Sequence, residues 1–338
     1  MFVLSKLLLK FRTFFRVVIL SLLLILPVFA FQIDFSYAAT TTAQKNQKKI
    51  VSNNKHKQTY KHKQTYKPVQ TSLVVDGKTG KILHAQNENT KIYPASLTKV
   101  MTLYLLFEAL DSGKLSLHDS LHVSKKASAS LPCKLNLKAG EKITVKEAIL
   151  GLIVKSANDA AVTVAENMAG SEQKFAKLMT LRAKTLGMKN TIFTNASGWH
   201  DPRQMTTAID LAKLSIAIRR DFPQYYGFFA KTNFNFRGKQ VNGHNSLTAN
   251  YPGAEGLKTG FTNPAGRNLI TTATRNGRTL VGIVTGSHSR THRDTKMANL
   301  LDEHFGVSKK LVTTKSMGSK PNSKKAKSSK IKLASSKR

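Results

Sequence analysis

The sequence predicts an α+β fold in which one antiparallel sheet, built from both ends of the folded region, carries a helical insertion. Two short strand-like segments around a tight turn open this region at residues 72–84. Apolar segments with helical spacing fill residues 97–219, and short alternating segments return at residues 232–285. Pairing the early and late strands in one sheet and packing the helices on it buries the apolar faces of both.

The positive charge of the 338-residue chain is concentrated at its ends, although the net charge of the whole is +36. Residues 45–67 contain eight Lys and no acid, and residues 308–338 contain ten Lys, one Arg and no acid. Self-repulsion and a shortage of apolar residues keep such runs from forming a core. We therefore expect a basic disordered linker at 39–70, a folded domain at 71–306 and a basic disordered tail at 307–338.

These two basic ends have two interpretations. The doubled hexapeptide Lys-His-Lys-Gln-Thr-Tyr at residues 55–66 is typical of a duplicated, solvated linker. Polycationic segments also hold a protein near an anionic membrane or wall polymer. We expect the first interpretation to apply and keep the second as the alternative.

A signal peptide for export is predicted at residues 1–38. Four Lys and Arg residues before position 17 precede the apolar run 17–31, as in the n-region and h-region of a secretory signal. Small residues predict cleavage after Ala38, with Ala30 as a second candidate. An uncleaved anchor is the alternative, but fifteen residues are short for about 30 Å of hydrocarbon. We expect the domain in the periplasm or on the wall side of the cytoplasmic membrane.

Cys133 is the only cysteine, so no intrachain disulfide forms. We expect it to be a small buried side chain, with a reactive thiol as the alternative. The ten His are scattered, and no His/Cys cluster has the spacing of a zinc site. The sequence therefore predicts neither a metal nor a cofactor.

Each expected element has its own local signal. Turn residues separate the first two strands, Gly187 ends one helix, Pro223 lies just beyond another, and Asn276-Gly277 joins the last two strands. The expected strands are 72–76, 81–84, 232–236, 256–260, 268–274 and 279–285, and the expected helices are 97–110, 145–154, 159–169, 172–186 and 206–219.

The string Ser96-Leu97-Thr98-Lys99 is the first candidate for catalysis. A serine hydroxyl is a poor nucleophile until a base takes its proton. Residues three apart at a helix start share one face, where free backbone N–H groups face developing negative charge. The same Ser-x-x-Lys pattern occurs at Ser52, Ser171 and Ser329, but these serines lie in charged linkers or at a predicted helix cap. Among the four, only Ser96 follows a Pro-Ala turn and begins an apolar helix.

Two further strings follow in order. Ser156-Ala157-Asn158 stands between two predicted helices, where Ser156 can relay a proton and Asn158 can donate to a substrate carbonyl, although a plain helix cap is the alternative.

Lys258-Thr259-Gly260 lies on a predicted strand, whose edge can pair with an extended peptide. Lys258 supplies charge, Thr259 a hydroxyl, and Gly260 allows close approach of the substrate. A second cation near Lys99 would also lower the pKa of that lysine.

Together these strings resemble the penicillin-recognising serine enzymes. The match is closest to the D-alanyl-D-alanine carboxypeptidase family of low-molecular-mass penicillin-binding proteins, serine peptidase family S11. It extends over residues 93–101, 154–161 and 255–262, and Gly198 and residues 206–212 also look like family strings. The resemblance covers about residues 71–306 and implies the penicillin-binding-protein/β-lactamase-like transpeptidase fold.

The resemblance also implies catalytic roles. Ser96 would form the acyl-enzyme, Lys99 would be the base, and Ser156 would shuttle the proton. The backbone N–H groups of Ser96 and Phe261 would form the oxyanion hole.

The implied substrate contacts lie on other segments. Asn158 would hold the substrate, and Lys258 and Thr259 would bind its terminal carboxylate. The family also uses an Arg after the last strand for this carboxylate; Arg293 fits best and Arg290 is the runner-up. Several family members carry a second β-domain and an amphipathic C-terminal anchor, whereas here the basic tail follows the domain, so electrostatic contact through this tail is the alternative to such an anchor.

The expected function is that of an exported serine-type D-Ala-D-Ala carboxypeptidase that removes the terminal D-alanine of peptidoglycan stem peptides. Such an enzyme takes part in peptidoglycan biosynthesis and in setting cell shape. We expect β-lactams to inhibit it. A DD-endopeptidase that cuts cross-links would share the same motifs. A β-lactamase is disfavoured, because Ser-Ala-Asn departs from the Ser-Asp-Asn of class A. The alternative of another class is a non-catalytic polyanion or wall-binding protein, and no specific nucleic acid partner is expected.

Overall fold

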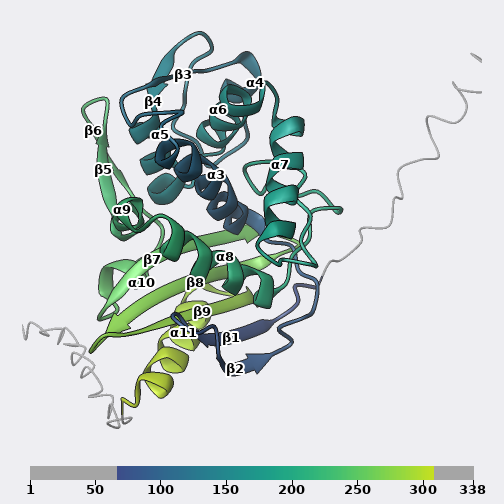
Figure 1. Cartoon of the computed structure of the whole chain (residues 1–338), viewed down its shortest axis with the longest axis vertical. Coiled ribbons are helices and arrows are strands. Elements are labelled where there is room, and N and C mark those ends of the chain that lie inside the picture. The colour runs from purple at the N-terminus through teal and green to yellow at the C-terminus, as the bar shows by residue number, and fades with distance from the viewer. Residues whose placement is uncertain (1–66, 308–338) are drawn as a thin grey trace, which may run out of the picture. The chain divides into compact units, whose positions relative to one another are not determined.

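An antiparallel sheet of five strands, in the order β2-β1-β9-β8-β7, is the central layer of this computed structural model, which describes residues 67–307. Strand β1 from the start of the domain pairs with β9 from its end, with Thr71 opposite Thr285 and Asp76 opposite Leu280. The prediction of one sheet built from both chain ends is thus confirmed (Figure 1). The strands are β1 (Thr71–Asp76), β2 (Ile82–Gln86), β7 (Ala254–Thr262), β8 (Gly266–Arg275) and β9 (Arg278–Ser287).

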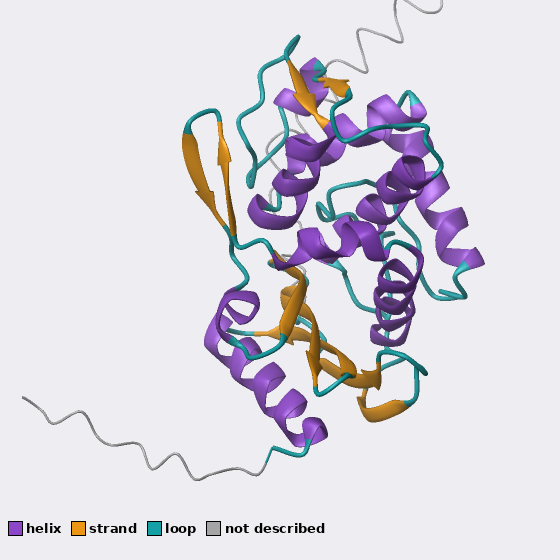
Figure 2. Ribbon diagram, turned by 60° about the vertical axis from the view of Figure 1, so that its left-hand side comes forward, coloured by secondary structure: helices purple, strands orange, loops and turns teal. Residues whose placement is uncertain are grey.

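The two faces of the sheet are buried by different helices. Successive side chains of a strand point to opposite faces. Leu73 and Val75 of β1 therefore join the core formed with the helical insertion, whereas Val74 packs with residues of α11 (Arg290–Phe305). Figure 2 shows the sheet between α11 and the other long helices.

The helical insertion lies between β2 and β7, as predicted. Several of its helices begin with a side-chain cap: Thr144 and Glu147 form a reciprocal capping box, and Ser171 accepts from the N–H of Lys174. The helices are α3 (Lys99–Asp111), α4 (Lys125–Ser128), α5 (Val145–Leu150), α6 (Asn158–Ala169), α7 (Glu172–Thr185), α8 (Ala208–Asp221), α9 (Pro223–Tyr226) and α10 (Ser246–Asn250), and two hairpins pair β3 (Ser120–His122) with β4 (Lys142–Thr144) and β5 (Asn233–Phe236) with β6 (Lys239–Asn242).

Helix α11 is absent from the sequence prediction, which closes the core with strands. Its 16 residues are mostly polar, and only Arg293, Met297, Leu300 and Leu301 are buried. A single narrow apolar stripe on a charged helix gives a weak periodic signal, although it is enough to cover one face of a sheet.

The predicted signal peptide, most of the linker and nearly all of the tail lie outside the described residues and remain predictions. Within residues 67–307, no helix combines the length and the apolar content needed to cross a bilayer.

Candidate active site

Ser96 lies in a tight 3-10 turn, η1 (Ala95–Thr98), that leads directly into α3. Ala95 adopts a left-handed conformation with φ of 50°, which costs a non-glycine residue about 1 kcal/mol. Two neighbours enforce this turn. The amide of Asn268 donates to the carbonyl of Tyr93 at 3.0 Å, and a Cβ on Gly198 would lie only 1.9 Å from the Ala95 oxygen. The nucleophile candidate is therefore held by packing that only glycine permits at position 198.

The Lys99 ammonium nitrogen contacts three oxygens. Nζ lies 3.2 Å from Ser96 Oγ, 2.8 Å from Asn158 Oδ1 and 2.5 Å from the Ser197 carbonyl oxygen. A neutral amine has two N–H groups and one lone pair. A protonated Lys99 donates to all three oxygens, whereas in the neutral amine hydrogen bonds to Asn158 and Ser197 would use both N–H groups and leave the lone pair for the Ser96 hydroxyl.

Burial favours the neutral form of Lys99. Its side chain is fully buried, and burial lowers its pKa well below the ordinary value of lysine, with a further lowering by the charge of Lys258. The predicted effect of a second cation on Lys99 is thus present, but desolvation is the larger cause.

Ser156 ends a π-turn, η2 (Gly151–Lys155), in a left-handed conformation with φ of 60°. This sharp exit from the helix turns the serine toward the same cavity as Ser96. The predicted unbroken helix at 145–154 is therefore α5 followed by a wider turn. Strain of this kind at a non-glycine residue often marks a functional position.

Both polar atoms of the Asn158 side chain form hydrogen bonds within the protein. Its oxygen accepts from Lys99, and its nitrogen donates to the carbonyls of Leu131 and Pro132 at 3.1 and 3.0 Å. Donation to a substrate carbonyl, as predicted, would replace one of these loop contacts.

The loop opposite Ser96 is fixed from beneath by Asp159. Its two carboxylate oxygens accept from the backbone N–H groups of Leu135 and Leu137 at 3.0 and 3.1 Å, and the Asn158 N–H donates to the Cys133 carbonyl at 2.7 Å. This backbone anchoring leaves the Cys133 side chain facing the cavity. The expectation of a buried Cys133 is wrong, because the thiol is exposed and lines the cavity beside Ser96.

Lys258, Thr259 and Gly260 lie on β7, an edge strand of the sheet. Lys258 is only 2% exposed, and burial lowers its pKa to about 7, with a smaller effect of Arg293. Its Nζ donates to the Thr259 carbonyl at 2.9 Å. A Cβ on Gly260 would lie 3.1 Å from the backbone nitrogen of Ser96, so the strand and the nucleophile turn pack closely together.

Positive groups gather at one end of the cavity. Arg293 is 3% exposed and pairs with Asp294, its Nε lying 2.7 Å from Oδ1. The guanidinium of Arg267 stacks on the Phe261 ring, 4.5 Å from its centre. Burial, followed by the charge of Lys258, lowers the pKa of His244. Arg293 and the runner-up Arg290 both line the cavity.

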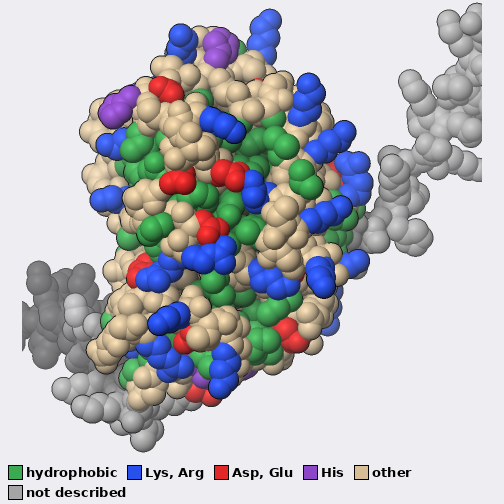
Figure 3. All heavy atoms as spheres, in the orientation of Figure 1, with side chains coloured by type: hydrophobic (Ala, Val, Ile, Leu, Met, Phe, Trp, Pro, Cys, Tyr) green, Lys and Arg blue, Asp and Glu red, His purple; other side chains and the backbone are tan. Residues whose placement is uncertain are grey.

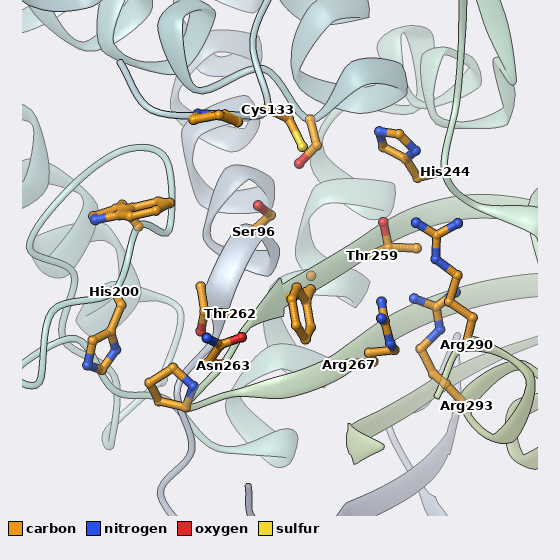
Figure 4. A pocket seen from close by; sticks show the side chains of 16 residues that line it. Ser96, Cys133, His200, His244, Thr259, Thr262, Asn263, Arg267, Arg290 and Arg293 are labelled. Atoms are coloured by element: carbon orange, nitrogen blue, oxygen red, sulfur yellow. The ribbon is translucent and has the colours of Figure 1, made fainter. Parts of the chain in front are cut away.

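The cavity has a volume of about 470 Å³. Ser96, Ser156, Thr259, Gly260, Phe261 and Arg293 line it, and the predicted residues Lys99, Asn158 and Lys258 are buried behind its wall. Figure 4 shows Ser96 at the centre, with His244, Thr259, Arg290 and Arg293 on one side and His200 and Asn263 on the other.

Sequence reasoning missed the contacts of Ser197, Asn268, Arg267 and His244. Asn268 had a usable signal, because a buried Asn inside a strand is uncommon. The Ser197 contact is made by a backbone carbonyl and therefore has no sequence signal. The chain has a second Lys-Thr-Gly string at residues 78–80, but it forms a turn, in which the Thr79 N–H and hydroxyl both donate to Asp76.

Comparison with known proteins matches residues 40–289 to the family model described as D-alanyl-D-alanine carboxypeptidase, Peptidase_S11. D-alanyl-D-alanine carboxypeptidase DacF of Bacillus subtilis is 34% identical over 240 residues, which are 70% of this chain and 61% of DacF. DacC of Escherichia coli is 35% identical, over 69% of this chain and 60% of DacC. The match thus spans about three fifths of the length of these relatives.

Solved structures agree in fold. Penicillin-binding protein 6B of Escherichia coli superposes with a TM-score of 0.65 at 35% identity, over 68% of this chain and 75% of that one. The ampicillin-bound form of penicillin-binding protein D2 of Listeria monocytogenes gives 0.62 at 30% identity, over 69% of this chain and 95% of that one. The α+β transpeptidase fold expected from the motifs is therefore confirmed.

Proposed function

The chain belongs to the D-alanyl-D-alanine carboxypeptidase family, peptidase family S11, and we propose that it removes the terminal D-alanine from peptidoglycan stem peptides through an acyl-enzyme on Ser96. The observation that carries this proposal is the Lys99 amine, buried, depressed in pKa and 3.2 Å from Ser96 Oγ. That geometry is the one a serine needs to become a nucleophile near neutral pH.

In the acylation step, the lone pair of Lys99 takes the Ser96 proton as Oγ attacks the carbonyl of the penultimate D-alanine. The proton then passes to the leaving amine, with Ser156 as the relay. The C–N bond breaks, free D-alanine departs, and an ester links the remaining peptide to Ser96. The backbone N–H groups of Ser96 and Phe261 are the proposed oxyanion hole.

In the deacylation step, Lys99 takes a proton from water, whose oxygen attacks the ester carbonyl. Ser96 regains its proton, and the shortened peptide leaves as a carboxylic acid. The protein returns to its starting state, and water is the only molecule consumed besides the substrate.

The cationic end of the cavity supports recognition of a terminal carboxylate. Lys258 and Arg293 are both at least nine-tenths buried, so an anion placed between them is screened little by water. Thr259 adds a hydroxyl at the same end. These residues, with Asn158 behind the cavity wall and Gly260 and Phe261 on β7, are the proposed substrate-binding set.

The same proposal places the domain outside the cytoplasmic membrane, where stem peptides and β-lactams occur. The rival function of a polyanion binder predicts a basic stripe on the domain. Figure 3 instead shows Lys and Arg scattered over the visible face. Electrostatic contact of the basic ends with membrane or wall remains a separate prediction.

Labelling with a fluorescent penicillin tests the proposal. The full chain should be labelled at Ser96, and Ser96→Ala should remove the label while the thermal unfolding midpoint stays within about 3 °C. The matched control is Ser171→Ala, which changes the other described Ser-x-x-Lys string and should label normally. Label retained by folded Ser96→Ala protein would sink the assignment.

A further inference from the structure

The Ser197 carbonyl that contacts Lys99 belongs to a peptide group that is held from both sides. A trans peptide group has its C=O and its N–H on opposite edges of one plane. On one edge the Ser197 oxygen lies 2.5 Å from Lys99 Nζ. On the other edge the Gly198 N–H donates to the side-chain oxygen of Asn195 at 2.7 Å. A single peptide plane therefore connects Asn195 to the candidate base.

The Asn195 side chain also closes the turn that contains this peptide group. Its nitrogen donates to the Trp199 carbonyl at 2.9 Å, and its oxygen accepts from the Ser197 hydroxyl at 3.3 Å. Asn is suited to this task because its short side chain carries both a donor and an acceptor that reach the nearby backbone. The orientation of the Ser197 carbonyl is thus set by a side chain two residues earlier in the chain.

The Gly198 N–H depends on Asn195 because it lies away from solvent. Ser197 is 4% exposed, and Gly198 is buried as well. A buried N–H that loses its acceptor costs free energy, and rotation of the peptide plane is the way to find another one. Such a rotation would move the Ser197 oxygen away from Lys99. Asn195 itself is outside the set of described residues that line the cavity around Ser96.

We infer that Asn195 is a positioning residue for the reaction, which orients the Ser197 carbonyl toward Lys99 and so directs the lone pair of the neutral amine at Ser96. The inference rests on the proposed function. A hydrogen bond to the N–H of a peptide group also polarises its carbonyl, so the contact with Asn195 strengthens the acceptor that it orients. Asn195 exchanges no proton and forms no bond with the substrate.

Loss of the oriented carbonyl has a defined effect on the pKa of Lys99. A carbonyl binds an ammonium group more strongly than a neutral amine, because that hydrogen bond is charge-assisted. Its removal therefore disfavours the ammonium form and lowers the pKa of Lys99 further. The titratable groups that act on Lys99 are Lys258, Asp159 and Cys133, all on other segments of the chain. The acid limb of the pH–rate profile should then move to lower pH, whereas removal of the Lys258 charge should move it to higher pH.

The test uses the purified full chain and three variants. Asn195→Ala removes both polar atoms of the side chain. Asn195→Asp keeps an oxygen for the Gly198 N–H and gives up the donated hydrogen bond. The matched control is Asn167→Ala, because Asn167 also ties backbone groups together, those of His122 and Thr163, and is not among the described residues that line the cavity around Ser96.

Each protein is assayed in three ways. Release of D-alanine from a D-Ala-D-Ala peptide gives kcat, KM and the pH profile of kcat/KM. The rate of labelling by a fluorescent penicillin reports acylation without a peptide substrate. The thermal unfolding midpoint reports stability.

Asn195→Ala should lower kcat and the rate of penicillin acylation about 10- to 100-fold, as a misplaced catalytic group does, while KM stays within about twofold. Its acid limb should move to lower pH. Asn195→Asp should recover most of the lost rate, and its acid limb should lie at or above the wild-type pH, because a negative charge favours the ammonium form. Asn167→Ala should lower the unfolding midpoint but change neither the rates nor the acid limb.

The direction of the acid limb decides the inference. A limb of Asn195→Ala that stays in place or moves to higher pH would overturn it, as would equal rate losses in Asn195→Ala and Asn195→Asp. The same changes in Asn167→Ala would show that general loosening of the domain is the cause. If Asn195→Ala does not fold, Asn195→Asp decides alone, because a limb displaced to lower pH in that variant contradicts the inference.

Failure of the proposed function has a different signature. Wild-type protein that releases no D-alanine and takes no penicillin label refutes the proposed function together with the inference. Wild-type protein that is labelled, with Asn195→Ala labelled at the same rate, refutes the role of Asn195 and keeps the proposed function.

Discussion

Replacing Lys258 by Ala separates two roles that this lysine has in the proposed mechanism. Its ammonium group is 2% exposed, and its one hydrogen bond among the described residues goes to the Thr259 carbonyl. A carboxylate there would gain a charge-assisted hydrogen bond of about 1.5–3 kcal/mol. Lys258→Ala should therefore lower kcat/KM for a D-Ala-D-Ala peptide about 10- to 150-fold. The same peptide ending in an amide should lose much less, because it has no charge to bind.

The second role acts through Lys99. The charge of Lys258 lowers the pKa of Lys99, so its removal should raise that pKa. Lys99 must be neutral to accept the Ser96 proton. The acid limb of the pH–rate profile should therefore move to higher pH, on the acid and amide substrates alike.

The titration of Lys258 itself should determine the pH dependence of kcat/KM on the alkaline side of the profile. Its pKa is about 7 in the free protein, so its positive charge is lost as pH rises through that value. In the wild type, kcat/KM for the carboxylate substrate should decline above about pH 7, while the amide substrate should not follow. Lys258→Ala should abolish this difference.

The assay is a pH series of kcat/KM on the paired peptides for wild type, Lys258→Ala and Arg293→Ala. Arg293→Ala should have a smaller effect, because its guanidinium already pairs with Asp294. Lys239→Ala serves as the control for removal of one positive charge. Equal losses on acid and amide, or an acid limb that stays in place, would refute the reasoning.

Two further predictions concern the frame of the site and the basic ends. Asp159→Ala should lower the free energy of unfolding by about 3 kcal/mol and slow penicillin acylation. The reason is that the buried carboxylate accepts hydrogen bonds from three backbone N–H groups, two of them in the loop that carries Cys133. Denaturant unfolding, with Asp159→Asn as the milder control, checks this prediction, and unchanged stability would contradict it. Deleting residues 39–70 and 308–338 removes 19 of the 54 basic residues and no acid. Pelleting of the protein with anionic vesicles should therefore fall and lose most of its salt dependence, while peptide turnover stays nearly constant. Equal pelleting of both forms at every salt concentration would show that the ends are passive linkers.

The sheet could be predicted because its strands have strong local signals. Turn residues bracket β1 and β2, and Asn276-Gly277 separates β8 from β9, so both hairpins are evident from the sequence. The pairing of β1 with β9 is non-local, but it was the economical way to bury both sets of strands. Helix α11 was not predicted because only three apolar residues and one Arg of its 16 residues are buried, which gives a weak periodic signal.

The three candidate strings could be found in the sequence because each has side-chain chemistry at fixed spacing, and the structure brings residues of all three to one cavity. The shape of the site could not. Cys133 faces the cavity because Asn158 and Asp159 hold the backbone of its loop, and no local pattern around the cysteine records contacts made more than twenty residues away.

The state of Lys99 shows where sequence reasoning stops. A Ser-x-x-Lys string supplies a nucleophile and an amine, but the amine becomes a base only if it is neutral and its lone pair points at the serine. Burial favours the first condition, and two fixed acceptors favour the second, because hydrogen bonds to them use both N–H groups of the neutral amine. One acceptor is the Ser197 carbonyl, whose loop is held against the nucleophile turn because Gly198 has no Cβ. The motif therefore needs a glycine about one hundred residues away to work, and this dependence is set by the fold.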